Sequence, residues 1–228
     1  MSVRVRPDAP IMLKEKYYIS KIDYKTAMQL VIEHHYLHRQ APCSHAYGLF
    51  EKNDCPLLEK IVGVVTYGVS CSSTLLKGIC GPEESKNVYE LTRLWIHDSV
   101  GKNAESFLIG NTIKLLDKEI IVSFSEIAQG HVGTVYQATN FYYCGLSTKF
   151  SDPKVKGLEH KHHATYANRM SKEEILQKYG SENVYYIERP RKHRYVYFNV
   201  KNKKRKQELL NKLRYKICSY PKNNAEIV

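Results

Sequence analysis

A strand–helix–strand pattern between residues 87 and 126 constrains the fold of this chain more than any other feature. Residues 88–96 are rich in β-branched, aromatic and aliphatic side chains, which is typical of a strand. Residues 104–116 repeat apolar side chains at helical spacing, and residues 120–124 form a short apolar run of the kind found in buried strands. Two such strands joined by a helix form a right-handed crossover, so the sequence predicts an α/β (α+β) fold.

The loop between the first strand and the helix spans residues 98–104. Backbone N–H groups at a helix N-terminus attract anions, so the loop predicts a site for a phosphate-bearing donor. The residues assigned to this cofactor site are Ile96, Gly101, Lys102, Asn103 and Ala104. The alternative is an ordinary strand-to-helix turn. The loop also lacks the full glycine spacing of a strong coenzyme A pyrophosphate cradle.

The chain carries a formal net charge of +12, and nearly all of it lies in one segment. Residues 189–216 contain twelve Lys or Arg and one acidic residue, Glu208. Charge concentrated in this way indicates a polyanionic partner, and nucleic acid before a membrane. We therefore expect a nucleic acid as the partner, and a homodimer is left open. The alternative is a solvated basic tail that binds nothing.

Within the basic segment, four residues are suited to the DNA backbone and several tyrosines are available for stacking on bases. The predicted nucleic-acid contacts are Arg191, Lys192, His193, Arg194 and Tyr143, with Tyr142, Tyr195 and Tyr197 as further stacking candidates. No apolar run approaches the length of a membrane span, and residues 1–10 lack a signal-peptide pattern, so we expect a cytoplasmic protein.

Several blocks of sequence, in order, resemble the Mom family of Mu-like phages over roughly residues 30–198. These blocks are HYLHR at 35–39, YELTRL at 89–94, ESFLIG at 105–110, SFSE at 123–126, GHVGTVYQATNFYY at 130–143 and PRKHRY at 190–195. One departure is Ser125-Glu126 where the family usually carries Ala-Asp, which places the carboxylate about one methylene further out. The resemblance implies a GNAT-type fold and conversion of adenine in DNA to its carbamoylmethyl form, a phage or prophage device against restriction. It also implies that the nucleic-acid partner is double-stranded DNA, with tRNA as a second candidate.

The resemblance and the periodicity together predict a domain layout. We expect a single GNAT-like catalytic domain over residues 1–200, with a central mixed, twisted sheet flanked by helices and an irregular basic insertion at 149–170. Residues 201–228 are predicted to form a basic C-terminal helical tail. The further expected elements are strands at 17–22, 46–51, 61–67, 185–187 and 195–200, helices at 24–39, 171–179 and 203–217, and a loop at 70–86 that could cover the site.

The chemistry of adenine acylation suggests the catalytic groups. The exocyclic amine is a weak nucleophile, so the enzyme must accept a proton and stabilise an oxyanion. Glu126 follows a buried strand, where ligands bind in open α/β sheets, and we predict it to be the general base or a ligand of the flipped base. The resemblance implies Tyr136 as the general acid, with a core tyrosine as the alternative.

Four further residues complete the predicted catalytic set. Ser106, Arg93, Tyr36 and His38 are the remaining candidates. Ser106 could donate to a phosphate or the acyl oxygen, and Arg93, as a buried cation, should face a carboxylate or phosphate. Tyr36 and His38 could contact the target base.

No pattern of ligands in the sequence establishes whether the protein requires a metal ion. His35 and His38 would share one face of a helix extending to residue 39 and could contribute to an iron or other metal site. The six cysteines show no metal spacing and are expected to be reduced thiols.

The atoms of the product indicate the donor. Glycyl and carbamoylmethyl groups are isomers, so a glycyl group joined to the adenine amine could rearrange to the product. We therefore predict glycyl-tRNA in preference to acetyl-CoA, because acetyl-CoA brings no nitrogen.

Two other functions stay open at this point. A GNAT-type N-acetyltransferase acting on a protein or small molecule would explain the core but not the basic segment. A non-catalytic DNA-binding phage protein would explain the basic segment but not Glu126, Tyr136 and Arg93.

Overall fold

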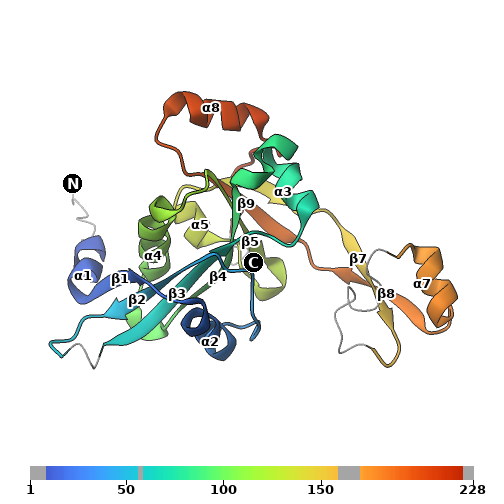
Figure 1. The fold of residues 1–228 in the computed structure, drawn as a ribbon, viewed down its shortest axis with the longest axis horizontal. Helices are drawn as coiled ribbons and strands as arrows, with labels where there is room; N and C mark the ends of the chain where they lie inside the picture. Colours follow the sequence, from blue (N-terminus) through green and yellow to red (C-terminus); the bar gives the residue numbers. More distant parts are fainter. Residues whose placement is uncertain (1–8, 56–58, 159–169, 223–228) are drawn as a thin grey trace.

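A mixed β-sheet with helices on both faces forms the body of the protein (Figure 1). The computed structural model describes residues 9–55, 59–158 and 170–222. Within these ranges the main sheet has seven strands in the order β1-β2-β3-β4-β5-β9-β6. Their bounds are β1 Tyr17–Lys21, β2 His45–Glu51, β3 Lys60–Gly68, β4 Val88–Ile96, β5 Ile120–Glu126, β6 Tyr142–Leu146 and β9 Lys192–Phe198. This arrangement confirms the predicted central mixed sheet.

The predicted strand–helix–strand unit is present as β4, helix α4 (Ala104–Thr112) and β5, and the two strands are parallel. They pair only where Val88–Glu90 of β4 faces Ile120–Val122 of β5. Beyond these residues β4 continues to Ile96 and β5 to Glu126, with β5 paired instead to β9. The carboxyl halves of β4 and β5 therefore diverge, and a gap opens in the middle of the sheet.

A β-bulge lies in β4 next to this gap. Thr66 of β3 faces Arg93, whereas the next residue, Tyr67, faces Leu91, so Thr92 has no residue opposite it. A bulge of this kind shifts the alternation of side chains between the two faces of a strand. The Thr92 hydroxyl lies 2.8 Å from the Thr66 hydroxyl and donates to the Pro42 carbonyl at 3.0 Å, so the buried polar groups at the bulge are satisfied.

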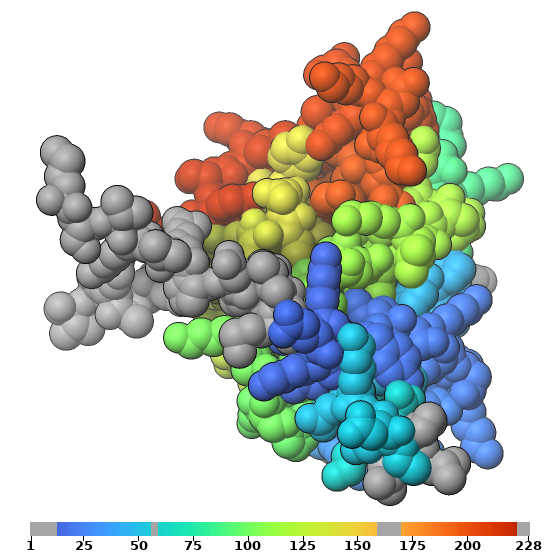
Figure 2. Space-filling view, turned by 90° about the vertical axis from the view of Figure 1, so that its left-hand side faces the viewer, coloured from blue at the N-terminus to red at the C-terminus, as the bar shows by residue number. Residues whose placement is uncertain are grey.

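Helices cover both faces of the sheet. The largest apolar cluster joins the sheet to α4, to α5 (Thr134–Ala138) and to Leu13 of α1 (Ala9–Lys16). On the opposite face, α2 (Tyr24–His34) packs on β2 and β3, and α3 (Ser73–Cys80) and α8 (Lys203–Lys212) pack on β4, β5 and β9. On the side shown in Figure 2, α8 stands at the upper end and the N-terminal elements lie below it.

A second, two-stranded sheet projects from the body as an arm (Figure 1). It consists of β7 (Phe150–Val155), β8 (Val184–Arg189) and helix α7 (Lys172–Tyr179), and the two strands pair antiparallel. A capping box formed by Ser171 and Glu174 begins α7, and Gly180 follows its last residue, so the helix predicted at 171–179 is present.

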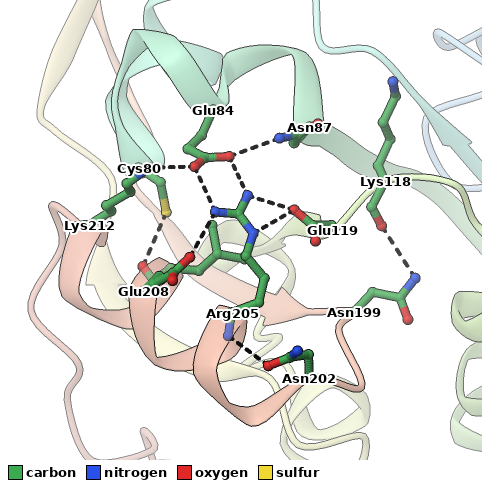
Figure 3. A network of polar contacts seen from close by, with 11 residues as sticks. Cys80, Glu84, Asn87, Lys118, Glu119, Asn199, Asn202, Arg205, Glu208 and Lys212 are labelled. Carbon is green, nitrogen blue, oxygen red and sulfur yellow. Dashed lines mark hydrogen bonds and ion pairs between the residues drawn. The ribbon is translucent and has the colours of Figure 1, made fainter.

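The α8 helix is attached to the body by a network of ion pairs (Figure 3). Arg205 donates to both carboxylate oxygens of Glu84, at 3.0 and 2.7 Å, and to Glu119 at 2.6 Å. Lys212 donates to Glu84 at 2.6 Å. The side chains of Arg205 and Lys212 hold the pKa of Glu84 at about 2. Two cations of the basic segment therefore form ion pairs within the fold. The division predicted between a catalytic domain ending at residue 200 and a C-terminal tail stays a prediction.

Several element predictions need correction. The α2 helix ends at His34 rather than near residue 39, because His35 is extended and His38 has a positive φ of 44°. The segment 70–86 is not a loop over the site: it contains α3, capped by Ser72, and a 3₁₀ helix (Pro82–Asn87) that packs with α3.

The expected irregular insertion also needs correction, since part of 149–170 forms β7, while residues 159–169 lie outside the described residues. The last helix, α8, ends at Lys212 rather than at residue 217. Within the described ranges, no helix has the length and apolar character that crossing a bilayer requires.

We expect Arg205→Ala to lower the unfolding free energy by about 3 kcal/mol, because it leaves the buried carboxylate of Glu84 without its main partner. The exposed neighbour Lys204→Ala is the matched control and should change stability by less than about 0.5 kcal/mol. Urea unfolding measures both.

The difference in unfolding free energy between the wild type and the Arg205→Ala variant should shrink as the pH falls from about 4 to about 2. The depressed pKa of Glu84 stabilises the fold only while the carboxylate is ionised. Equal midpoints for the two variants at neutral pH would show that the network does not hold α8.

Candidate active site

The gap between β4 and β5 opens into a cleft of about 730 Å³. Residues from both diverging strands line it, Glu90–Leu94 from β4 and Phe124–Glu126 from β5. Segments distant in sequence complete the wall: residues 35–37, residues 130–136 with Ala138, Lys192 of β9, and four residues at the start of α4, Lys102, Asn103, Glu105 and Ser106. A cleft of this size and mixed lining is typical of a small-molecule or nucleotide site.

Glu126 lies at the mouth of the cleft between two partners from other parts of the chain. Tyr36 donates a hydrogen bond to Glu126 Oε2 at 3.0 Å, and Lys192 Nζ lies 3.5 Å from Glu126 Oε1. Burial, and then the hydrogen bond to Glu126, raise the pKa of Tyr36 to about 12. The tyrosine is therefore protonated at neutral pH and acts as a hydrogen-bond donor to the carboxylate.

Aromatic rings surround the Tyr36 side of the mouth. The His35 ring stacks on Tyr36 with centroids 4.4 Å apart, and His131 meets Tyr36 edge-on at 6.4 Å. Burial, and then the nearby charge of Arg93, lower the pKa of His35 to about 4, and His35 Nδ1 accepts from the Leu37 amide at 3.2 Å. His35 is therefore neutral, and its ring holds the backbone at Leu37 and stacks on the Tyr36 ring, which restricts the position of Tyr36.

Tyr136 forms part of the cleft wall from the α5 side and is buried among aromatic rings. Its ring packs 5.4 Å from Phe141 and 5.2 Å from Tyr195. Burial raises the pKa of Tyr136, so its hydroxyl is protonated at neutral pH. The turn before α5 requires glycine, because Gly133 has a φ of 73° and a Cβ there would lie 2.5 Å from the Tyr195 ring.

Arg93 extends from the bulged part of β4 into the cleft wall. Its guanidinium donates to the Thr92 carbonyl at 2.6 Å and to the Gln40 carbonyl at 3.3 Å, and its buried Nε has no partner among the described residues. Burial, and then the charge of Arg39, lower the pKa of Arg93. The charge of Glu90, which lines the same cleft, acts on Arg93, but among the described residues no carboxylate lies within salt-bridge distance of the guanidinium. Arg93 therefore keeps unsatisfied capacity for an anion or carbonyl oxygen.

The start of α4 also lines the cleft. Asn103, with a left-handed φ of 67°, precedes the helix, and no side-chain hydrogen bond caps it. The first backbone N–H groups of a helix have no partner within the helix, so this end can receive a phosphate or acyl oxygen. Ser106 lines the cleft there, and its hydroxyl donates to the Asn103 carbonyl at 3.0 Å.

Comparison with known proteins identifies the family. The Mom protein family matches residues 16–222. The chain belongs to this family. A curated relative, the methylcarbamoylase Mom of Escherichia phage Mu, is 27% identical over 208 residues, covering 86% of this chain and 80% of that protein. The resemblance seen in the sequence is confirmed.

Solved structures similar to this Mom-family chain include acetyltransferases. A putative acetyltransferase from Salmonella typhimurium, solved with acetyl-CoA, is 12% identical with a TM-score of 0.45, and covers 82% of this chain and 96% of its own. The ribosomal-protein-S18-alanine N-acetyltransferase of Escherichia coli is 7% identical with a TM-score of 0.45, covering 82% and 97%. The family membership does not depend on these matches.

The cleft of this Mom-family protein brings together five of the six predicted catalytic residues. Glu126, Tyr136, Ser106, Arg93 and Tyr36 all line it. His38 does not: it is exposed, and its Nδ1 lies 2.9 Å from the Ile32 carbonyl at the end of α2. Of the predicted donor site, Lys102 and Asn103 line the cleft. Ile96 and Ala104 pack into the apolar core, and Gly101 lies at the turn without lining the cleft.

The residues predicted to contact nucleic acid differ in their exposure to solvent: three are buried and two are half-buried. Tyr143 and His193 are buried and hydrogen-bonded to each other at 2.9 Å, and buried Arg194 stacks on Tyr215 at 3.8 Å. These three side chains lack the surface that direct contact with a phosphate requires. Arg191 is half-buried and donates to the Ser147 carbonyl at 2.7 Å, and Lys192 faces Glu126.

Sequence reasoning missed two parts of the site. His35 was considered only as a metal ligand paired with His38, but the helix ends before both residues. Among the described residues, no group of three His, Cys, Asp or Glu is placed to hold a metal ion. Lys192, predicted to contact DNA, lies on β9 opposite Glu126 of β5 and faces its carboxylate, a pairing that only strand register reveals.

We expect His35 to remain neutral as the pH is lowered from about 7 to about 5, since burial lowers its pKa from 6.5 to about 4. The folded chain then binds fewer protons than the unfolded chain, so the contribution of His35 to stability is full above pH 6.5 and is lost as the pH falls towards 4. Long-range ¹H–¹⁵N NMR spectra of the imidazole rings measure this. Titration of His35 near pH 6.5 would contradict the buried placement.

Proposed function

We propose that this Mom-family protein is a DNA-modifying acyltransferase that converts adenine in duplex DNA to N6-carbamoylmethyladenine. Family membership supports the reaction class, since the phage Mu relative is named a methylcarbamoylase. The single structural observation that carries the proposal is the cleft between β4 and β5. It holds a carboxylate, a buried tyrosine, an incompletely satisfied arginine and a helix N-terminus within one cavity.

The adenine enters the cleft from the Glu126 side. A base in a duplex must be unstacked before its exocyclic amine can be reached, and aromatic rings recover part of that cost. Tyr36, with His35 behind it and His131 at its edge, is the aromatic group at the mouth. Glu126 stands beside it and accepts the proton that the amine loses when it attacks the acyl carbon.

The donor occupies the opposite side, against the start of α4. Its anionic part faces the free N–H groups of the helix and Lys102, and Ser106 lies next to the acyl group. Arg93 stabilises the oxyanion of the tetrahedral intermediate, because its guanidinium has donor capacity that the protein does not use. Tyr136, protonated at neutral pH, gives a proton to the departing oxygen of the donor.

Glycyl-tRNA is the donor we favour over acetyl-CoA, because its atoms account for the product. The adenine amine displaces the tRNA hydroxyl from the glycyl carbonyl and forms an amide. The free glycyl amine then attacks ring carbon C6 to give a five-membered ring, and cleavage of the bond from C6 to the original nitrogen opens it. The result carries C6–NH–CH₂–CO–NH₂, with no atom gained or lost in the rearrangement.

We expect Glu126→Gln to reduce adenine modification by about 100-fold or more, since removal of a general base costs 10² to 10⁴ in rate. Plasmid DNA from cells expressing each variant is digested to nucleosides, and the modified adenine is quantified by mass spectrometry. Glu51→Gln, an exposed carboxylate at the end of β2, is the control and should keep full activity. Unmodified adenine with the wild-type protein would refute the proposed reaction.

The donor assignment predicts that carbon and nitrogen label in glycine passes into the modified base. Purified protein, plasmid DNA and glycyl-tRNA charged with labelled glycine should yield a nucleoside containing both labelled carbons and the labelled nitrogen. Labelled acetyl-CoA in place of glycyl-tRNA is the parallel reaction. A product labelled from acetyl-CoA alone would replace the glycyl route.

A further inference from the structure

The body of the protein offers few of the aromatic and basic side chains that the sequence assigned to DNA. Tyr143, His193, Arg194 and Tyr195 are buried in the sheet. Among the described residues, the large exposed aromatic side chains of the body, Tyr24, Tyr36 and Tyr220, belong to separate segments, whereas the arm groups three, Phe150, Tyr185 and Tyr186. A surface that holds a duplex beside the cleft therefore lies largely outside the residues predicted from the sequence to contact DNA.

The two faces of the arm differ. Strand pairing sets Val155 opposite Val184 on one face, and this face is covered by Ile175 and Tyr179 of α7. The other face, which we call the outer arm face, is formed by alternate residues of the two strands. It comprises Phe150, Asp152, Lys154, Tyr185, Ile187 and Arg189.

The outer arm face exposes an unusual amount of apolar surface for its size. Phe150 is 54% exposed, Ile187 48% and Tyr185 37%. Exposed apolar side chains gathered on one face, flanked by charge, mark an interaction surface. Arg189 lies 5.2 Å above the Phe150 ring and bonds to Asp152 at 2.6 and 3.0 Å, which holds a cation and an aromatic ring in a fixed arrangement.

The root of the arm lies at the mouth of the cleft. The chain leaves β6 at Leu146 and returns at Lys192, the first residue of β9, whose Nζ lies 3.5 Å from Glu126. The two sides of the root are tied together: Ser147 accepts hydrogen bonds from Arg191 Nε at 2.7 Å and from the Lys192 amide at 2.9 Å. A strand of six residues extends about 20 Å, so the arm reaches along a ligand that protrudes from the cleft.

We propose that the outer arm face holds duplex DNA next to the adenine that enters the cleft. This inference rests on the proposed function and adds the surface by which the polymer is held. Lys154 and Arg189 face the phosphates, while Phe150, Tyr185 and Ile187 contact sugars and base edges in the groove, as apolar side chains do in proteins that deform DNA. At 3.4 Å per base pair, the arm spans about six base pairs.

Charge favours DNA over a second copy of the chain as the occupant. The outer arm face carries two cations and one carboxylate, and the whole chain has a net charge of +12. A symmetric dimer formed through this face would bring the same cations together, since each copy presents the same patch. Within the described residues, no carboxylate lies within salt-bridge distance of Lys154, so its charge is available to a phosphate.

The test compares Phe150→Ala/Tyr185→Ala and Lys154→Gln with controls away from this face. Tyr24→Ala removes a comparably exposed tyrosine on α2, and Lys178→Ala removes a cation on α7. Fluorescence anisotropy with a short adenine-containing duplex, at several salt concentrations, measures affinity. The aromatic double variant should bind about 10-fold more weakly. Lys154→Gln should lower the salt slope by about 1. The controls should match the wild type.

Sedimentation and nucleoside analysis make the outcomes distinct. If the wild type modifies adenine while both arm variants bind and modify DNA as it does, the arm inference is overturned and the proposed reaction stands. If the arm variants lose self-association but keep DNA affinity, the outer arm face is a contact between two copies and the inference is likewise overturned. If the wild type binds DNA through the arm yet modifies no adenine, the inference stands and the proposed reaction fails. Circular dichroism confirms that the variants are folded.

Discussion

The divergence of β4 and β5 is the constraint on which the rest of the structure depends. The two strands share only three residue pairs, after which the backbone groups of their facing edges have no sheet partner in each other. The facing edges beyond these pairs border the cleft, while the outer edges stay paired, β5 with β9 and β4 with β3, which keeps both strands in the sheet. The start of α4 and helix α5 pack together on the same side of the gap. The gap therefore becomes a cleft whose walls are formed by strands and helices of the main body.

The polar groups of the cleft gain their properties from this setting. Tyr36, Glu126 and Lys192 come from three distant segments, and each restricts the other two. Burial keeps His35 and Tyr136 neutral, whereas Arg93 stays charged with one buried N–H unused. A low-dielectric cavity with fixed donors favours the stabilisation of developing charge, which is what acyl transfer to a weak nucleophile requires.

The positive charge of the chain divides into structural and available parts. Arg205 and Lys212 neutralise the buried Glu84 and attach α8 to the body, and Arg194 is stacked within it. The proposed contacts with DNA therefore fall on the arm and on the rim of the cleft rather than on the C-terminal segment as a whole. The arm and the cleft meet at Lys192, so one residue joins the surface proposed to hold DNA to the carboxylate proposed to receive the base.

The sequence alone specifies the order and type of most elements, because periodicity is a local property: the central strand–helix–strand unit and the helix predicted at 171–179 agree with the structure. It also determined family membership and five of the six catalytic candidates in the cleft. Only the tertiary structure decided that α2 stops before His35, that Lys192 faces Glu126, and that His193 and Arg194 are buried. Strand register, a bulge and burial decide these points, and each depends on contacts between residues far apart in the chain, which no local pattern encodes.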